Sequence, residues 1–547
     1  MTNDSTALRA PAEAARPDAR PGARPEPSAA LGRPWAGRPL PFHPLLLAAY
    51  PVLFLYGENV GELTLGDLVT PLVAILAGTV VALVVGAYVL RDSRRAALVV
   101  SALAAFLLLY GHLSGVLAPL GMRAGFQQIG WAILLAAVVV LAIRLRPDRL
   151  ANVTRALNLV AAVLVAFALV TIVPAEAQRF GRSTAAAATI DGASGPGRDI
   201  YYLVFDRYGS ARSLDLLYDI DDRPFLDGLR DRGFQIAPDS HANYVKTTLS
   251  LAATLNLDYL DDVVAAQDPA SDDHGPIYER LSNHAVGRFL RERGYRYVHV
   301  GSNYGPTESS AIADRNLRSG GPSDFLASLY DTSALPFIAR RLGVSSAAPD
   351  RERRYTVGKF QLDTLDQLAG EPGPSFVYAH LLLPHPPYVF ARDGSFVTDT
   401  LDTGRSQRDG YAEQLAYLQT RINGLVDRLM ARPEAERPII ILQADEGPYP
   451  RNYARNTVEY DWSTATPEEL EIKYGILNAM YLPGAEAPDL PPTLSAVNTF
   501  RLVLGAYFGA DLPLLPDRSY TSAGKFRPYD LTEITDRLPP PGSAAGS

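Results

Sequence analysis

The hydrophobic positions of this chain follow two different patterns, which change near residue 174. Residues 39–173 contain five apolar runs in succession, most of them close to the ~20 residues that a helix needs to cross a bilayer. The first run is short and contains two prolines. These runs are Pro41–Tyr56, Leu68–Leu90, Ala96–Leu120, Phe126–Ile143 and Leu157–Val173. Such a succession is unusual for buried helices of a soluble protein, so the pattern predicts a transmembrane domain of about five helices at 39–173.

Charged residues between the runs predict the orientation of these helices. Residues 1–38 are rich in Ala, Pro and Arg, lack an apolar period, and read as a disordered cytoplasmic tail. Two loops are rich in arginine, whereas Gly57–Gly66 has none and the loop before the fourth run has only Arg123. Because cytoplasmic loops carry the excess of Lys and Arg, we expect a multi-pass protein of the cell membrane whose carboxyl half is extracytoplasmic. The arginines of the two richer loops are Arg91, Arg94, Arg95, Arg144, Arg146, Arg149 and Arg155.

The second pattern begins after a stretch of small residues at 174–198, which reads as a flexible linker. From residue 199 to about 520, short apolar runs alternate with amphipathic segments, an order that is typical of an α/β sandwich. Residues 521–547 are polar and contain several prolines, so we expect them to be extended or disordered. The predicted strands are Asp199–Phe205, Gly233–Ala237, Tyr295–Val300, Phe376–Leu382 and Ile439–Ala444, and the predicted helices are Arg223–Arg232, Thr247–Leu257, Asn283–Arg293 and Tyr411–Met430.

Charge and composition exclude some kinds of function. The net charge of −8 argues against a nucleic-acid surface. The chain has no cysteine, which excludes disulfides, thiolate metal sites and a cysteine nucleophile. No charged residue lies in the middle of an apolar run, so the sequence offers no pathway for a transported ion.

Acidic residues follow two of the predicted strands at the point where each strand ends. Asp206 follows DIYYLVF, and Asp445 and Glu446 follow IIILQA. Because ligands bind at the carboxyl ends of strands in α/β sheets, neighbouring strands would bring three carboxylates together there. Such a cluster repels itself unless a cation holds it, so the motifs predict a site for one divalent cation. The alternative is that each acid-Gly pair is only a turn.

The segment between these strands contains a candidate nucleophile. Thr247 starts a predicted helix, where hydroxyls are usually caps. An alcohol is a weak nucleophile unless a metal or a base activates it, and Thr247 beside a cation meets that condition. Thr248 is the neighbouring alternative. The candidates for substrate binding are Asn243, Lys246, His380 and His385, the two histidines being five residues apart after a predicted strand.

These segments together resemble a known family. DIYYLVFDRYG, NYVKTTLSLAATLN, HLLLPHPPYVF, ILQADEGPYP and LNAMYLPG occur in the order found in the sulfatase-like hydrolases and transferases of the alkaline phosphatase superfamily. Apolar spans before such a domain are similar to lipoteichoic acid synthase and related membrane phosphoglycerol or phosphoethanolamine transferases. The resemblance implies one metal held by Asp206, Thr247, Asp445 and Glu446, with Thr247 as nucleophile and His385 at the substrate.

The late motif departs from the family pattern, which is usually Asp-His-Gly. Here it is Asp445-Glu446-Gly447, so the ligand set contains only oxygen. Oxygen ligands favour Mn²⁺, Mg²⁺ or Ca²⁺ over Zn²⁺, and the extra carboxylate adds negative charge where an anion must bind. We therefore expect a metal-dependent phosphotransferase or hydrolase that acts on phosphodiester or sulfate esters of anionic envelope lipids or glycans. The alternative is a catalytically impaired relative that binds an envelope glycan or lipid head group.

Overall fold

The computed structural model describes residues 39–61, 63, 65–117, 124–181, 190–193, 195, 197–320, 323–343, 349–453, 460–484, 487–522, 524 and 527–542. The tail predicted at 1–38 lies outside the described residues, as do parts of the predicted linker and of the last segment. Residues 1–40 and residues 41–547 are separate units, and every element below belongs to the second.

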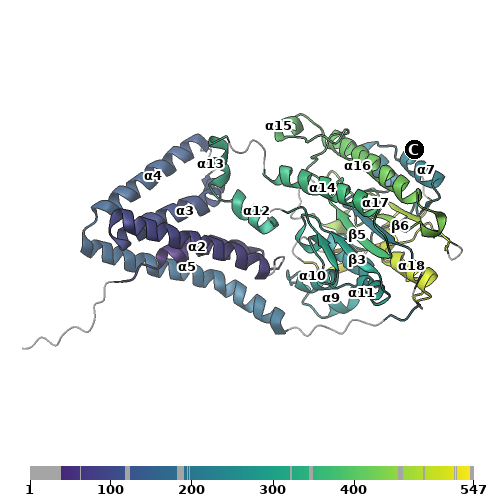
Figure 1. The fold of residues 1–547 in the computed structure, drawn as a ribbon, viewed down its shortest axis with the longest axis horizontal. Coiled ribbons are helices and arrows are strands. Elements are labelled where there is room, and N and C mark those ends of the chain that lie inside the picture. Colours follow the sequence, from purple (N-terminus) through teal and green to yellow (C-terminus); the bar gives the residue numbers. More distant parts are fainter. Residues whose placement is uncertain are drawn as a thin grey trace, which may run out of the picture. The chain divides into compact units, whose positions relative to one another are not determined.

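Five helices occupy the region of the five apolar runs (Figure 1). Three of them are long and apolar enough to cross a membrane, over Leu65–Leu90, Ser93–Gly111 and Pro147–Ala177, and Ile129–Arg144 is a shorter apolar segment. The first helix has 16 residues, contains Pro51 and is largely buried. The helices are α1 (His43–Glu58), α2 (Leu65–Leu90), α3 (Ser93–Leu117), α4 (Ala124–Arg144) and α5 (Pro147–Gly181).

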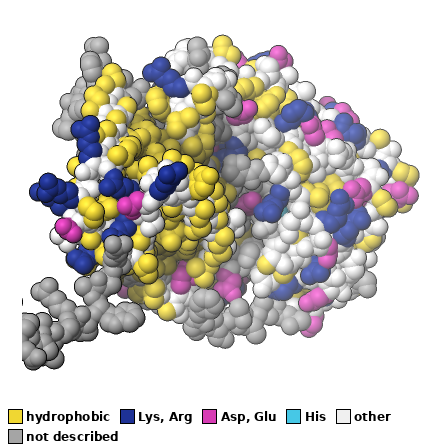
Figure 2. Space-filling view, turned by 60° about the vertical axis from the view of Figure 1, so that its left-hand side comes forward, with side chains coloured by type: hydrophobic (Ala, Val, Ile, Leu, Met, Phe, Trp, Pro, Cys, Tyr) yellow, Lys and Arg dark blue, Asp and Glu magenta, His cyan; other side chains and the backbone are white. Residues whose placement is uncertain are grey.

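Large apolar side chains on these helices are exposed, as expected for a surface that faces lipid. Val81, Val84 and Val85 of α2 and Val163 and Phe167 of α5 are each more than half exposed. Figure 2 shows hydrophobic side chains gathered over this helical part, whereas the other part of the molecule has charged side chains scattered among apolar ones. A soluble protein seldom exposes so large an apolar area, so this region is built for a bilayer.

The two arginine-rich turns lie together. The Arg95 guanidinium, in the first turn of α3, donates hydrogen bonds to the carbonyls of Ile143, at the end of α4, and Leu145, between α4 and α5. Elsewhere in the helical region, the Tyr56 hydroxyl of α1 donates to Glu176 of α5 at 2.6 Å. The carboxyl-terminal part of α5 is thus joined to α1, about 30 residues beyond the arginine-rich turn from which α5 starts.

The remainder of the chain forms a seven-stranded sheet with helices on both faces (Figure 1). The strand order is β2-β7-β6-β1-β5-β3-β4; β1 is parallel to β5 and β6, and β7 is antiparallel to β6. The central strands are buried on both faces, which explains their unbroken apolar runs. The strands are β1 (Ile200–Phe205), β2 (Gln235–Ile236), β3 (Arg296–Val300), β4 (Arg315–Leu317), β5 (Ser375–Leu381), β6 (Ile439–Ala444) and β7 (Asn478–Tyr481).

Alternate residues of β1 divide the core into two layers. Tyr201, Leu203 and Phe205 pack in one cluster with the helices α6, α7, α14 and α16, whereas Tyr202 and Val204 pack in a second cluster with α8, α10, α11 and α18. The main helices of this domain are α6 (Ala211–Tyr218), α7 (Arg223–Asp231), α8 (Thr247–Asn256), α10 (Gly275–Ser282), α11 (Ala285–Glu292), α12 (Asp324–Asp331), α14 (Pro349–Leu368), α16 (Gln407–Met430), α17 (Pro467–Tyr474) and α18 (Thr499–Phe508).

The α/β architecture and all five predicted strands are confirmed, with ends within three residues of the prediction. Two strands were missed: β4, which is only three residues long, and β7, which lies in the stretch LNAMYLPG. The region predicted as a linker is helical from residue 174 as far as Gly181, because α5 continues through Pro174. The last segment, expected to be extended or disordered, forms a hairpin of β8 (Tyr520–Ser522) and β9 (Leu531–Glu533).

Candidate metal centre and nucleophile

Sheet register brings the two acidic motifs side by side. Phe205 of β1 pairs with Leu381 of β5 and Ala444 of β6, so Asp206 and Asp445 are the next residues of adjacent parallel strands. His380 pairs with Val204, two positions before Asp206. Since side chains alternate between faces with a period of two, Asp206, His380 and Asp445 share one face of the sheet.

These three residues form a compact group of ligand-type atoms. One ligand atom of each lies within 4.8 Å of the others, and all three side chains are buried. Asp206 Oδ1, Asp445 Oδ2, Glu446 Oε2 and His380 Nε2 have no hydrogen-bond partner among the described residues. Buried polar atoms are normally paired, so the unpaired ligand-type atoms of Asp206, His380 and Asp445, with a further one on the neighbouring Glu446, indicate a site that an ion completes. Donors of this kind, mostly carboxylate oxygen, fit a divalent cation.

Thr247 lies at the edge of this group. It is the first residue of α8, and its hydroxyl is near enough to the Asp445 carboxylate to counteract part of the rise in the pKa of that acid. The backbone ties the same elements together, because the Ser250 hydroxyl donates to the Asp445 carbonyl at 2.7 Å. Thr247 is partly exposed, whereas Thr248 is only 3% exposed and faces the core. No side chain caps the start of α8, so its first N–H groups are available to an anion.

The electrostatics of the cluster require a positive charge. Burial raises the pKa of Asp206 to about 7; Arg207 opposes this shift and Glu446 adds to it. The pKa of Asp445 lies well above its ordinary value, first because of burial and then because of the charges of Asp206 and Glu446. Asp206 and Asp445 therefore both resist ionisation, as expected for a cation site without its ion.

Glu446 points to a different set of partners from Asp445. Its Oε1 lies 2.8 Å from Lys473 Nζ of α17 and 3.4 Å from Arg207 Nε. Both cations also lie on the ring of Tyr449, with Lys473 Nζ 3.6 Å and the Arg207 guanidinium carbon 4.0 Å from its centroid. Burial lowers the pKa of Lys473 to about 8, while Glu446 counteracts that shift. Glu446 is thus not one of the compact group of three, although its second oxygen is unpaired.

His380 is placed beneath the carboxylates rather than at an open surface. Its Nε2 lies 3.8 Å from Asp445 Oδ2, and its Nδ1 lies 2.9 Å from the Thr307 hydroxyl. Burial lowers the pKa of His380 to about 3, so its ring is neutral. If Nδ1 donates to Thr307, Nε2 carries the lone pair and is a ligand; if Thr307 donates, Nε2–H orients Asp445 instead. Either role differs from the substrate contact expected for His380, because the side chain is fully buried.

The other three expected substrate-binding residues are placed differently from one another. His385 Nε2 lies 4.0 Å from Asp206 Oδ2, on a partly exposed side chain, so it borders the cluster. Lys246 immediately precedes Thr247 and is also partly exposed. Asn243 is a correction: it is fully buried, and its amide binds the Arg518 carbonyl and the Val497 N–H at 2.7 Å each. All its strong contacts fix the carboxyl-terminal segment, so we assign it a structural role.

Three residues of the site were not singled out from the sequence. Arg207 and Tyr449 stand inside the motifs DRYG and DEGPYP, directly beside the predicted ligands, so their position was a usable signal. Lys473 lies 27 residues after Glu446 in a helix of mixed composition. A single lysine in such a helix reads as solvent-exposed, and only the tertiary packing shows that it is buried.

Comparison with known proteins agrees with this geometry. The family model described as "Sulfatase" matches residues 207–474. This part of the chain is a sulfatase-family domain. The match begins one residue after Asp206 and includes Thr247, both histidines, the Asp-Glu-Gly motif and Lys473. The predicted relationship to the sulfatase family is confirmed for this part of the chain, and no curated protein matches the sequence.

Solved structures similar to the chain include transferases and sulfatases. The periplasmic domain of EptC from Escherichia coli is 12% identical and covers 67% of this chain and 100% of its own, with a TM-score of 0.42. The lipooligosaccharide phosphoethanolamine transferase EptA from Neisseria meningitidis is 14% identical and covers 85% and 95%, with a TM-score of 0.37. The 2-O GAG sulfatase BT1596 is 11% identical and covers 59% and 77%, with a TM-score of 0.35. Similarity at this level of identity does not show the activity of this chain.

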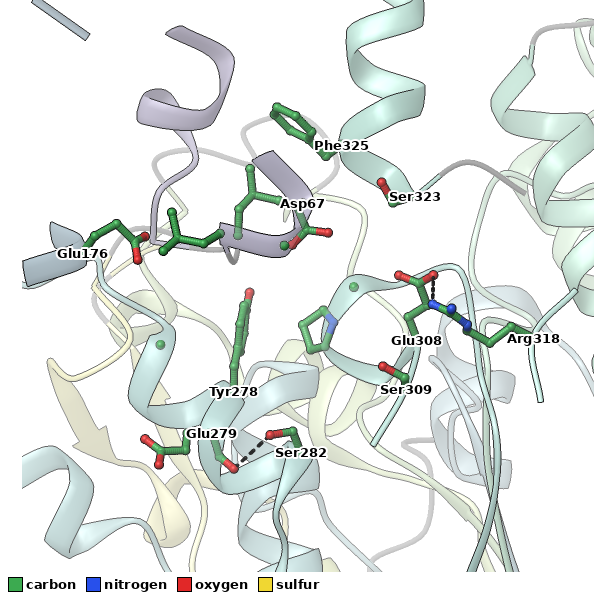
Figure 3. Close-up of a pocket in the computed structure, with 16 residues that line it drawn as sticks. Asp67, Glu176, Tyr278, Glu279, Ser282, Glu308, Ser309, Arg318, Ser323 and Phe325 are labelled. Carbon is green, nitrogen blue, oxygen red and sulfur yellow. Dashed lines mark hydrogen bonds and ion pairs between the residues drawn. The ribbon is translucent and has the colours of Figure 1, made fainter. Parts of the chain in front are cut away.

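A separate cavity of about 540 Å³ lies away from the carboxylate group, since none of the residues of the sulfatase-family site lines it (Figure 3). Most of its charged lining residues are acidic: Asp67, Glu176, Glu279 and Glu308. Glu308 pairs with Arg318 at 3.0 Å, as the close-up shows. Tyr278 and Phe325 add aromatic surface.

Proposed function

We propose that the protein is a membrane-anchored, metal-dependent phosphotransferase or hydrolase of the sulfatase family, with Thr247 as its nucleophile. The observation that carries this proposal is a partly exposed threonine hydroxyl beside Asp445, at the edge of a buried group of ligand-type atoms that lack hydrogen-bond partners among the described residues. A structural carboxylate cluster would pair these atoms within the protein. The substrate class is a phosphodiester or sulfate ester of an anionic lipid or glycan of the cell envelope.

The residues that would hold the cation are Asp206, Asp445 and Thr247, with Glu446 and His380 adjacent. Such an ion supplies positive charge that lowers the pKa of a nearby hydroxyl and offsets charge on the ester oxygens. The donor atoms are mostly oxygen, which favours Mn²⁺, Mg²⁺ or Ca²⁺.

The side chains divide the reaction between them. Asp445 orients the Thr247 hydroxyl and accepts its proton. The Thr247 oxygen forms a bond to phosphorus or sulfur while the bond to the leaving oxygen breaks, and the leaving oxygen takes a proton from His385. A water or an acceptor alcohol next attacks the same atom and gives its proton to His385, while the bond to the Thr247 oxygen breaks and that oxygen takes its proton back from Asp445. The free N–H groups at the start of α8 bind a non-bridging oxygen throughout.

His385 is the group placed to handle the protons. It borders Asp206 on the partly exposed side of the site. Burial, together with the charges of Arg207 and Arg354, keeps the pKa of His385 well below its ordinary value. A bound anionic ester opposes those charges and raises this pKa, so His385 becomes a proton donor for the leaving oxygen when substrate is present.

Thr247→Ala and Thr248→Ala form a matched pair of variants for the nucleophile. Thr247→Ala should lower turnover of a chromogenic phosphodiester or sulfate ester by at least about 10³-fold, because no other hydroxyl is placed to form the covalent ester. Thr248→Ala loses a buried hydroxyl and should change turnover much less. Mass spectrometry of the full chain after mixing with substrate should show modified Thr247. Turnover that survives in Thr247→Ala but not in Thr248→Ala contradicts the assignment, and no turnover in the parent with any divalent cation contradicts the enzyme itself.

We also propose that the sulfatase-family domain is extracytoplasmic. The arginine-rich turns at the start of α3 and the start of α5 lie together, so they share one side of the membrane. Their excess of arginine supports the cytoplasmic side, and α5 then leads to the other side. Because the chain has no cysteine, a single introduced cysteine is a unique label. A membrane-impermeant thiol reagent added to intact cells should label Asp409→Cys in the domain and should not label Arg149→Cys in the turn. The reverse labelling pattern contradicts this topology.

A further inference from the structure

Glu446 stands where the family pattern usually has histidine, and its surroundings explain how a carboxylate fits there. Lys473 is 0% exposed, so its ammonium group can only be maintained by partners inside the protein. Its nearest anion is Glu446, at 2.8 Å, and Arg207 reaches the same oxygen at 3.4 Å. The neutral imidazole of the family's usual histidine has a charge of zero. The carboxylate of Glu446 paired with the ammonium group of Lys473 has the same total charge.

The backbone fixes this pair as firmly as the side chains do. The N–H of Gly447 donates to the Lys473 carbonyl at 2.8 Å. A Cβ at Gly447 would lie 2.3 Å from the Ile472 carbonyl and 2.9 Å from the Lys473 carbonyl, so only glycine allows this approach. Residues 446 and 473 are therefore held together whatever occupies the site.

Both cations contact Oε1 of Glu446, whereas Oε2 is buried and has no partner among the described residues. The carboxylate is thus held through one oxygen and presents the other. With Lys473 and Arg207 included, the charges of Asp206, Asp445 and Glu446 sum to −1 instead of −3. One divalent cation then leaves a site of net charge +1, which an anionic ester can approach.

We infer that Lys473, supported by Arg207, is the counter-charge of Glu446, and that the Glu446–Lys473 pair together replaces the family's neutral histidine. Lys473 holds Oε1 so that Oε2 faces the cation site, and it removes the negative charge that would repel the substrate. Lys473 is a positioning residue, since it acts through Glu446. This inference rests on the proposed function, and it assigns a role to a residue on a different element from the ligands.

The test is a double-mutant cycle in the full chain, with Lys473→Met, Glu446→Gln and the double variant. Met keeps the length of the lysine side chain and Gln keeps the shape of the glutamate, so the variants differ from the parent mainly in charge. Lys473→Met should raise KM for an anionic phosphodiester by about 10-fold or more and should tighten Mn²⁺ binding by about 10-fold, because the site becomes more negative. Damage to packing alone would not produce these opposite changes.

Adding Glu446→Gln to Lys473→Met should bring KM back to within about 3-fold of the parent, because the double variant has no uncompensated charge. Glu446→His alone should fold worse than Glu446→His with Lys473→Met, since the single change leaves Lys473 buried beside a neutral ring. If Lys473→Met does not fold, the double variant should still fold. The control is Glu471→Gln on the same helix, which touches His241 and Ser210 but not the site.

Additive effects in the cycle, or a Lys473→Met variant with unchanged KM and unchanged Mn²⁺ affinity, would overturn the inference. The Mn²⁺ measurements do not depend on turnover. A parent without activity whose Mn²⁺ affinities nevertheless show the coupling would therefore contradict the proposed reaction and support the pairing of Glu446 with Lys473.

Discussion

Strand β1 has a buried aspartate at each end, and the two differ in what surrounds them. Asp199, just before the strand, accepts the Ser375 N–H at 2.6 Å and the Arg432 guanidinium at 2.7 Å. Asp206, just after the strand, is equally buried, yet its Oδ1 has no hydrogen-bond partner among the described residues. The two aspartates are therefore buried to the same extent. They differ in whether their carboxylate oxygens have hydrogen-bond partners, and this difference distinguishes a structural carboxylate from a metal ligand.

The physical reason lies in the direction of the strands. At the amino end of β1 a side chain meets backbone N–H groups and an arginine from α16's far end, which pair it. At the carboxyl end, adjacent parallel strands deliver Asp206 and Asp445 to one place, and among the described residues Asp206 Oδ1 and Asp445 Oδ2 are left without a donor. A carboxyl-end cluster is thus incomplete as protein alone, which is what a binding site requires.

The largest expected effect comes from Asp206→Asn. Turnover should fall by at least about 10³-fold and Mn²⁺ binding should be lost, because one charged ligand is removed. In metal-free protein the same change should raise the melting temperature at pH 8, since a buried, repelled negative charge is deleted. Metal titration and thermal unfolding with and without Mn²⁺ measure both effects. A metal-free variant that is less stable than the parent would place Asp206 with the structural carboxylates.

Asp199→Asn should have the opposite sign in stability. It leaves the Arg432 guanidinium without its carboxylate, which should cost about 3 kcal/mol of unfolding free energy. The fraction that remains folded should bind Mn²⁺ and turn over substrate as the parent does, because Asp199 lies at the other end of β1. Thermal unfolding paired with metal titration distinguishes the two results. Loss of metal affinity in the folded variant would break the comparison.

Asp222 is a third buried carboxylate, and it differs from Asp199 and Asp206 because its described hydrogen-bond partners are neutral. It contacts the Tyr208 hydroxyl at 3.1 Å and Gln419 Nε2 at 2.6 Å, and burial raises its pKa from 3.8 to about 7. An acid whose pKa is raised by folding stabilises the fold fully below pH 3.8, and that contribution is lost as pH rises through about 7. The gap corresponds to roughly 4 kcal/mol as an upper figure.

Asp222→Asn cannot ionise, so it should stabilise the protein by about 1–2 kcal/mol at pH 8 and change little at about pH 3.5, below the unfolded pKa. Melting temperatures of parent and variant across this range measure the difference. An equal effect of the substitution at both pH values would show that Asp222 is ionised in the folded protein. Its neutral partners would then be sufficient to stabilise the buried carboxylate.

Periodicity alone was enough for the architecture. Unbroken apolar runs predicted the membrane helices, and strands such as Ile439–Ala444 ending in acids predicted the sheet and the metal-binding edge. These signals are local, since a helix or a buried strand imposes its own period on the sequence. The first apolar run shows the limit of such local signals. It predicted a membrane helix, but α1 has only 16 residues and is not among the candidate spans. Composition alone does not report whether an apolar helix faces lipid or protein.

The site was only half determined by the sequence. Asp206 and Asp445 could be predicted because each follows a strand, and adjacent parallel strands end at the same edge of the sheet. Thr247 could be predicted because it starts the helix α8 between them. The partners of Glu446, the burial of Lys473 and the placement of His380 beneath Asp445 could not, because they depend on how α17 and β5 pack against β6. Sequence patterns state which face a residue occupies; the charge that it meets there comes from distant parts of the chain, and only the tertiary structure decides it.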